Sequence, residues 1–219
     1  TAAIAALATA QLALFTTAEI TALKTTQVAA LSASQLQNLA TAQLNALTSL
    51  QVAALSSTQA TSLLDAQLAA LSTTQLTSLS PSAVAAFSIT QLAQFGTTGI
   101  AALKTSQVAA LTSPQVTALA SAQLDALTSS QVPWLSTAVI AALSSAQLGQ
   151  LSTGEISALK TAQVAAFNTS ALSGLSTAQI AALSYAQVSA LSSSEVASLS
   201  TVQLDTLNTA QVQGLSLPA

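Results

Sequence analysis

The sequence predicts an all-α protein, a solenoid of short capped helices with one helix in each eight-residue repeat. Three observations predict it: an unbroken octapeptide frame, a helix-start signal in each octad, and apolar residues that only neighbouring octads can cover. In this frame, 26 complete octads run from Ala8 to Leu215 without insertion or deletion. Repeats of fixed length are typical of solenoids, in which each unit packs on its neighbours. The expected helices have about six or seven residues, roughly two turns.

The repeat is well represented by KTTQVAAL, residues 24–31, and it recurs as KTSQVAAL at 104–111 and STAQIAAL at 176–183. Position eight of the octad is Leu or Phe in all 26 copies, and position five is aliphatic in 25, with Ala60 as the exception. Position four is Gln in 19 copies and Glu in three, namely Glu19, Glu155 and Glu195. Positions five and eight lie three apart, so one side of a short helix carries the core.

The start of each octad carries the signals of a helix N-terminus. Position one is Ser, Thr, Asn or Gly in 19 octads, as expected of an N-cap. Gln or Glu then falls at N3, which completes a capping box, and the flanking apolar residues form a hydrophobic staple. Pro81 falls at the first helical position, where proline is well tolerated. A helix of two turns is unstable alone, so neighbouring octads must hold it.

Other backbone arrangements fit the pattern less well. In one continuous helix the apolar pair would rotate by about 80° per octad, so no stripe and no coiled coil would form. Strands are disfavoured because Ala, Gln and Leu dominate and the apolar spacing is not two. A β-helix-like coil remains as the alternative, since many solenoids of short period are built from strands. The position-four Gln has two possible structural roles, capping its own helix or bridging backbone groups between coils.

A longer period of 80 residues groups the octads into blocks of ten. Lys24 recurs as Lys104, and Phe15 as Phe95, so the chain holds about 2.7 blocks. Val at position five recurs at an average spacing of about 3.3 octads, which suggests that one coil holds about 3.3 octads. Tandem duplication without geometric meaning is the alternative. We expect residues 1–219 to form a single continuous solenoid.

The composition excludes several classes of function. Charged residues make up 4% of the chain and the net charge is −3, which gives no electrostatic footprint for nucleic acid. Polar residues interrupt every octad, so no membrane-spanning run is present. Cys and His are absent and the six acidic residues are scattered, so we expect no catalytic residue, no cofactor, no metal site and no enzyme activity. The three lysines, Lys24, Lys104 and Lys160, are expected to complement the C-terminal dipoles of preceding helices.

Two aromatic positions depart from the repeat. Pro133 and Trp134 replace the usual small pair, and they predict an interrupted helix with the indole either covering the groove or contacting a partner. Tyr185 and Ile89 replace a polar position two and are expected on the surface. Trp134 and Tyr185 are therefore the candidate partner-contact residues.

The octads KTTQVAAL and STAQIAAL resemble repeat regions of very large bacterial secreted or cell-surface proteins of the adhesin and filament kind. The resemblance implies an extracellular structural or adhesive role and supplies no catalytic residue. We expect a structural building block of a filament, sheath or surface layer that associates with itself, end to end or laterally, or with flanking segments of a longer chain. An adhesin segment is the alternative. Ice binding is a third possibility, because 14 octads have Thr at position two.

Overall fold

The computed structural model describes residues 2–215 and divides the chain into two compact units. The N-terminal unit ends at Leu111 and the C-terminal unit begins at Thr112. Within the described residues every regular element is a helix, which confirms the predicted fold class, and each octad contributes one helix. The α-helices have between 4 residues, as in α1 (Ala2–Ala5), and 7 residues, in α13 (Gly96–Ala102), and the N-cap and closing turn complete the octad.

The remaining helices of the N-terminal unit follow one another at intervals of about eight residues. They are α2 (Thr9–Leu12), α3 (Thr17–Ala22), α4 (Thr25–Val28), α5 (Ala33–Gln37), α6 (Thr41–Asn45), α7 (Ser49–Ala53), α8 (Ser57–Thr61), α9 (Asp65–Ala70), α10 (Thr73–Leu76), α11 (Pro81–Ala86), α12 (Ile89–Ala93) and α14 (Thr105–Ala109).

The C-terminal unit repeats this pattern, with one 3-10 helix in place of an α-helix. Its elements are α15 (Ser113–Thr117), α16 (Ser121–Leu124), η1 (Val132–Trp134), α17 (Thr137–Ala142), α18 (Ser145–Gln150), α19 (Thr153–Ala158), α20 (Thr161–Val164), α21 (Thr169–Ser173), α22 (Thr177–Ala181), α23 (Tyr185–Ser189), α24 (Ser193–Ala197), α25 (Thr201–Asp205) and α26 (Thr209–Gly214).

The caps expected from the sequence form in the structure. Ser32 precedes α5 with an extended backbone, and its side chain accepts a hydrogen bond from the Gln35 N–H, while the Gln35 side chain accepts from the Ser32 N–H. Ala40 has no side-chain acceptor, yet its N–H still donates to Gln43 Oε1 at 2.8 Å. The Gln half of the box therefore starts a helix even where position one lacks a hydroxyl.

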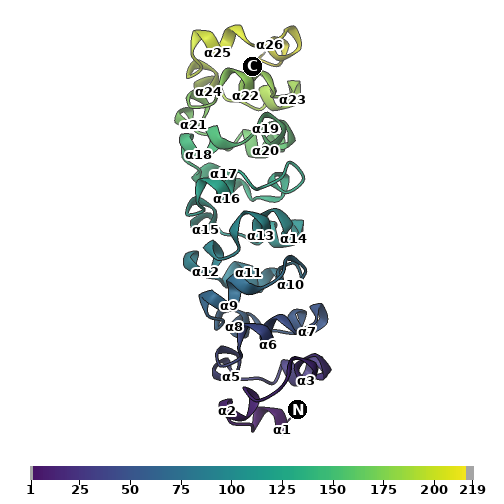
Figure 1. Ribbon diagram of the computed structural model, residues 1–219. Coiled ribbons are helices and arrows are strands. Elements are labelled where there is room, and N and C mark those ends of the chain that lie inside the picture. Colours follow the sequence, from purple (N-terminus) through teal and green to yellow (C-terminus); the bar gives the residue numbers. More distant parts are fainter. Residues whose placement is uncertain (1, 216–219) are drawn as a thin grey trace. The chain divides into compact units, whose positions relative to one another are not determined.

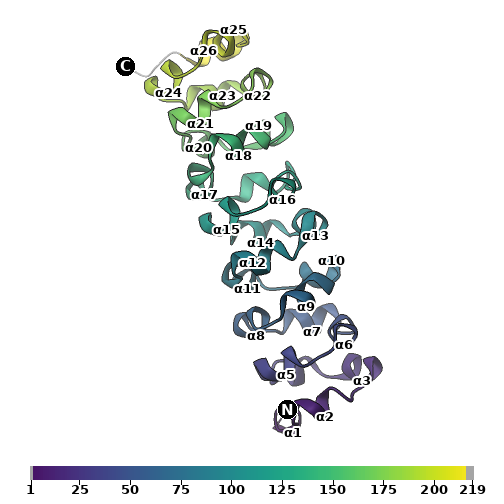
Figure 2. The same cartoon turned by 60° about the vertical axis from the view of Figure 1, so that its left-hand side comes forward.

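Within each unit, helices pack on helices three octads away. In the N-terminal unit α11 contacts both α8 and α14, and in the C-terminal unit α17 contacts α20 and α23 contacts α26. Figure 1 shows the short helices of each unit following one another around successive coils, and Figure 2 shows α8 beside α11 and α17 beside α20. The hydrogen bonds between coils join residues 25 to 31 apart, so one coil holds between three and four octads. This agrees with the predicted value of about 3.3.

The aliphatic side chains at positions five and eight form the core of each unit. Leu44, Leu92, Ile140 and Leu148 have at most 1% of their surface exposed, whereas Leu14, at position seven, is 82% exposed. Burial of one such aliphatic side chain contributes about 1.5–3 kcal/mol, so the core must supply the stability that the short helices lack alone.

Small residues at position seven allow close contact between successive coils. A Cβ atom added to Gly174 would lie 2.6 Å from the Cβ of Ser145, three octads earlier. Gly214 stands in the same relation to Tyr185, whose carbonyl oxygen would lie 3.0 Å from an added Cβ. At these two positions a larger side chain has little room, because a neighbouring helix lies against the glycine. Within residues 2–215, no helix is long and apolar enough to cross a membrane.

Candidate functional site

The position-four glutamine performs both roles that the sequence left open, with different atoms. Gln51 Oε1 accepts a hydrogen bond from the Thr48 N–H at the start of its own helix, at 2.7 Å. Its Nε2 donates to the carbonyl oxygens of Ile20, Thr21 and Leu23 in the preceding coil, at 3.0, 3.2 and 2.7 Å. The amide group carries an acceptor and two donors, so one side chain caps a helix and joins two coils.

This contact recurs along both units and forms what we call the glutamine ladder. Each ladder Gln donates to carbonyl groups 28 to 31 residues earlier, and the bond to the residue 28 earlier ranges from 2.6 Å for Gln179 to 3.2 Å for Gln91. The members bonded in this way to residues of their own unit are Gln35, Gln43, Gln51, Gln59, Gln67, Gln75, Gln91 and Gln107 in the N-terminal unit, and Gln147, Gln163, Gln179, Gln187, Gln203 and Gln211 in the C-terminal unit.

The ladder satisfies backbone groups that the short helices leave unpaired. The last four carbonyl groups of a helix have no hydrogen-bond partner within the helix. In a helix of five residues, most carbonyl groups are therefore of this kind. Gln107, 1% exposed, donates to Leu76 and Leu79, at the end of α10 and just beyond it. Each such bond contributes about 0.5–1.5 kcal/mol, and a buried carbonyl without it costs about 1–3 kcal/mol.

In the first coil of the N-terminal unit, the position-four side chains make only the hydrogen bond that caps their own helix. Gln11 Oε1 accepts from the Ala8 N–H and Gln27 Oε1 accepts from the Lys24 N–H, both at 2.8 Å. In the same coil, Glu19 accepts from the N–H and hydroxyl of Thr16, which lowers the pKa of its carboxyl group. Gln11 and Glu19 are exposed, whereas Gln35 in the next coil is 3% exposed.

Trp134 lies at the surface of the C-terminal unit, as one of the two predicted partner-contact residues. Pro133 shortens the octad's helix to the 3-10 turn η1, which confirms the predicted interruption. The indole is 49% exposed, and Lys160 Nζ lies 4.9 Å from its ring centroid. The contact is a cation–π pair. The sequence pattern predicted only that Lys160 complements a helix dipole. Lys160 and Trp134 are 26 residues apart, about one coil, and this spacing is the sequence feature from which their contact could have been predicted.

Tyr185, the second predicted contact residue, is 54% exposed at the start of α23. Ile89 is also exposed, as expected, and begins α12 of the other unit. Trp134 and Tyr185 lie seven octads apart, about two coils, so they do not form one compact patch. The exposure of Tyr185 is as predicted, and contact of either residue with a partner stays a prediction.

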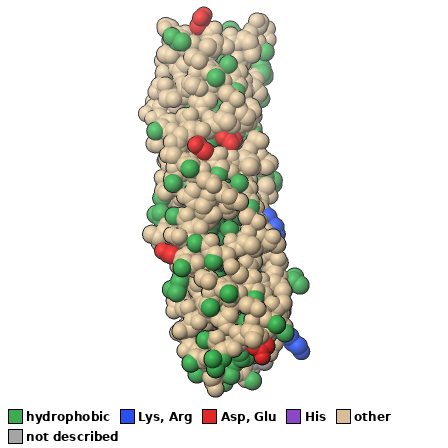
Figure 3. Space-filling model, in the orientation of Figure 1, with side chains coloured by type: hydrophobic (Ala, Val, Ile, Leu, Met, Phe, Trp, Pro, Cys, Tyr) green, Lys and Arg blue, Asp and Glu red, His purple; other side chains and the backbone are tan. Residues whose placement is uncertain are grey.

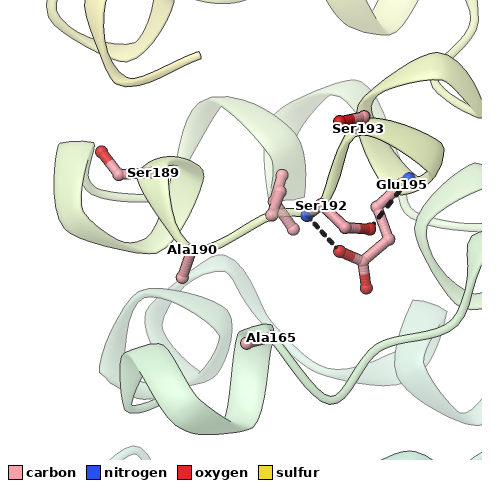
Figure 4. A pocket seen from close by; sticks show the side chains of 7 residues that line it. Ala165, Ser189, Ala190, Ser192, Ser193 and Glu195 are labelled. Atoms are coloured by element: carbon pink, nitrogen blue, oxygen red, sulfur yellow. Dashed lines mark hydrogen bonds between the residues drawn. The ribbon is translucent and has the colours of Figure 1, made fainter. Parts of the chain in front are cut away.

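A shallow pocket of about 460 Å³ opens in the C-terminal unit beside Glu195 (Figure 4). Ala165, Ser189, Ser192 and Glu195 are among the residues that line it. Glu195 occupies a ladder position and is 7% exposed, and its Oε2 accepts from the Ser192 N–H. In the octad pattern this Glu takes the place of Gln, but a carboxylate has no N–H to give to the preceding coil.

Charged side chains are few and scattered on the face drawn in Figure 3. Within residues 2–215, no three acidic, histidine or cysteine side chains gather as a metal-binding group. Buried polar side-chain atoms in this part of the chain all have a hydrogen-bond partner. The chemistry that the structure displays is therefore mainly hydrogen bonding between amide and carbonyl groups.

The fold and the glutamine ladder define a class, an α-helical repeat protein in which most octads are hydrogen-bonded to the preceding coil through a glutamine side chain. Four overlapping stretches, residues 84–121, 100–137, 134–161 and 156–193, match the family model of the ALTTAQ repeat. Together they run from residue 84 to residue 193, which is 110 of the 219 residues. The chain belongs to the ALTTAQ repeat family. The name matches the junction between octads, as in ALSSAQ at residues 142–147. No curated protein matches the chain.

Proposed function

We propose that the protein has a structural, non-catalytic role, as a building block whose coils associate with further coils of the same kind. The observation that carries this proposal is that the position-four glutamines of the first coil make only their capping bonds. The side-chain amides of Gln11 and Gln27 make only the capping bond. Every later ladder Gln of the N-terminal unit also donates from Nε2 to carbonyl groups of a preceding coil. A coil placed before Gln11 and Gln27, from a second copy or from a longer chain, would complete the same pattern.

The last coil of the C-terminal unit supports the same proposal. Position five is buried almost everywhere else, yet Leu204 is 38% and Val212 is 52% exposed. The corresponding residues of the preceding coils, such as Val188 at 2% exposure, are covered by the coil that follows. Another coil of this type therefore offers matching apolar and hydrogen-bonding groups to both faces.

Association in solution tests this proposal. The chain should form species that grow with protein concentration in sedimentation velocity, and electron microscopy should show chains joined end to end. The variant Leu204→Ser with Val212→Ser removes apolar groups from the last coil and should remain a monomer. Val202→Ser is the matched control, because Val202 is 65% exposed but lies at position three rather than five, and it should assemble as before. A chain that stays monomeric at every concentration contradicts self-association.

A second candidate function, binding of a partner along the surface as in an adhesin, is favoured by one observation. Trp134 and Lys160 form an exposed cation–π pair in an otherwise nearly uncharged surface. Aromatic residues are enriched where proteins contact one another. Replacing Trp134 and Tyr185 by Ala should abolish adhesion of cells or beads that display the chain, and unchanged adhesion would remove this candidate.

The geometry adds no argument for ice binding, because successive octads face different directions around a coil of three to four octads. Their position-two threonines are therefore distributed over several faces. A location outside a bacterial cell rests on the resemblance to secreted and surface repeat regions. It stays a prediction, to be tested by fractionation of the source cells with an antibody to the chain.

A further inference from the structure

Two glutamates interrupt the glutamine ladder inside the C-terminal unit. Glu155 and Glu195 occupy position four, and each is 7% exposed. Glu155 Oε2 accepts from the Ser152 N–H at 2.7 Å, and Glu195 Oε2 accepts from the Ser192 N–H. Both carboxylates thus keep the capping half of the ladder contact. Neither can make the bridging half, because an ionised carboxylate only accepts hydrogen bonds.

The register of the neighbouring octads shows what each carboxylate faces. Gln187 donates to Ile156 and Leu159, and Gln203 donates to Leu172 and Leu175, in each case 31 and 28 residues earlier. By the same register we expect the carbonyl groups of Val164, Ala165 and Phe167 to face Glu195, and those of Leu124, Asp125 and Leu127 to face Glu155.

In Figure 4 the second carboxylate oxygen of Glu195 points away from Ser192, toward the coil that carries Ala165. Among the described residues, no hydrogen-bond donor reaches the carbonyl oxygens of Leu127 or Phe167.

Such an arrangement gathers more oxygen acceptors than donors, since among the carbonyl groups only those of Val164 and Leu124 accept a backbone N–H in the described part of the chain. A carboxylate oxygen and two or three carbonyl oxygens all carry negative partial charge, and nine-tenths of the glutamate surface is removed from water. Electrostatics favours a positive charge at the centre of the group. The pocket beside Glu195 supplies an entrance, with the hydroxyl groups of Ser192 and Ser193 at its lining.

We propose that Glu155 and Glu195 each complete a calcium-binding site with the carbonyl oxygens of the preceding coil. Ca²⁺ takes six to eight oxygen ligands and accepts backbone carbonyls and water in flexible geometry. Mg²⁺ demands near-ideal octahedral geometry, and zinc prefers nitrogen and sulfur ligands. Each site has one carboxylate, so we expect weak binding, with Kd on the order of 10⁻⁴–10⁻³ M, as in extracellular calcium modules. The cation would replace the bridging N–H groups of Gln and join the two coils.

Calorimetric titration of the full chain with calcium chloride tests the proposal directly. The unmodified chain should bind two Ca²⁺ ions, Glu155→Gln and Glu195→Gln one each, and the double variant none. Glu19→Gln is the matched control, because Glu19 has the same octad position and capping bonds but is exposed in the first coil. It should still bind two ions. Absence of binding to the unmodified chain, or equal binding to the double variant, overturns the proposal.

Thermal unfolding gives a second readout that does not depend on assembly. Without calcium, Glu155→Gln with Glu195→Gln should unfold at a higher temperature than the unmodified chain, because Gln restores the bridging bonds. Calcium should raise the Tm of the unmodified chain and leave that of the double variant unchanged. If acidification stabilises the unmodified chain while calcium does not, a proton rather than a metal ion joins the oxygens, and the proposal is wrong.

Discussion

Gln51 Nε2 donates a hydrogen bond of 2.7 Å to the carbonyl oxygen of Leu23, a residue 28 positions earlier in the chain. The other end of the same amide accepts from the Thr48 N–H. The start of one helix is therefore held in a fixed position relative to the end of another helix in the preceding coil. Because this contact recurs, the ladder sets the register between coils, and the aliphatic core supplies most of the burial.

Removal of a ladder side chain should cost more than removal of a cap alone. Gln51→Ala leaves buried carbonyl groups without donors, and we expect the free energy of unfolding to fall by about 2–3 kcal/mol. Urea denaturation followed by circular dichroism measures the change. Gln11→Ala is the control, since Gln11 bonds only its own cap at Ala8, and it should cost less than about 1 kcal/mol. Equal losses in the two variants would show that the bridging bonds contribute nothing.

Gly174 should tolerate no side chain. Its backbone φ of −83° is open to any residue, so the effect of Gly174→Ala is purely steric, through the close approach to Ser145. We expect a loss of about 1–3 kcal/mol in the free energy of unfolding, as for other overpacked contacts. Ser145→Gly in the same chain should restore much of the loss.

Gly154→Ala provides the matched control for this steric argument. Gly154 lies within α19, and its nearest contact to an added Cβ would be Ser152 Oγ at 3.7 Å. Alanine should therefore stabilise the chain, by about 0.5–1 kcal/mol, because it loses less backbone entropy on folding than glycine. Destabilisation by both alanine variants would contradict the steric explanation.

Lys160 should report on the environment of the single tryptophan. Lys160→Met removes the charge above the Trp134 ring, and we expect a shift in the fluorescence spectrum and a loss of about 0.5–1 kcal/mol. Lys104→Met is the control, because Lys104 opens an octad of nearly the same sequence but lies in the other unit. The fluorescence should not respond to it. A spectrum unchanged by Lys160→Met would show that the pair does not persist in solution.

Glu19 should contribute a pH-dependent part of the stability. The N–H and hydroxyl of Thr16 lower the pKa of its carboxyl group in the folded chain, so the stabilisation is present at neutral pH. It should be lost as the pH falls through the lowered pKa in the acidic range. Denaturant midpoints measured from neutral to acidic pH should fall less steeply for Glu19→Gln than for the unmodified chain. Parallel curves would contradict this assignment.

Much of the fold follows from the octad itself. The N-cap at Ser32, the box with Gln35, the first-turn Pro81 and the buried position-five residues depend on groups three or four residues apart, so the sequence pattern predicts them. The coil of about 3.3 octads agrees with contacts between helices three octads apart. The prediction of one continuous solenoid over residues 1–219 remains a prediction, because the structure describes two units.

The sequence by itself therefore determined where helices begin and which side chains enter the core. Only the tertiary structure decided which carbonyl groups meet Gln51 and that Lys160 covers Trp134. The physical reason is the distance along the chain. Caps and staples join neighbours within one turn, whereas these contacts join residues 25 to 31 apart, and their pairing depends on how far one coil turns before it meets the next.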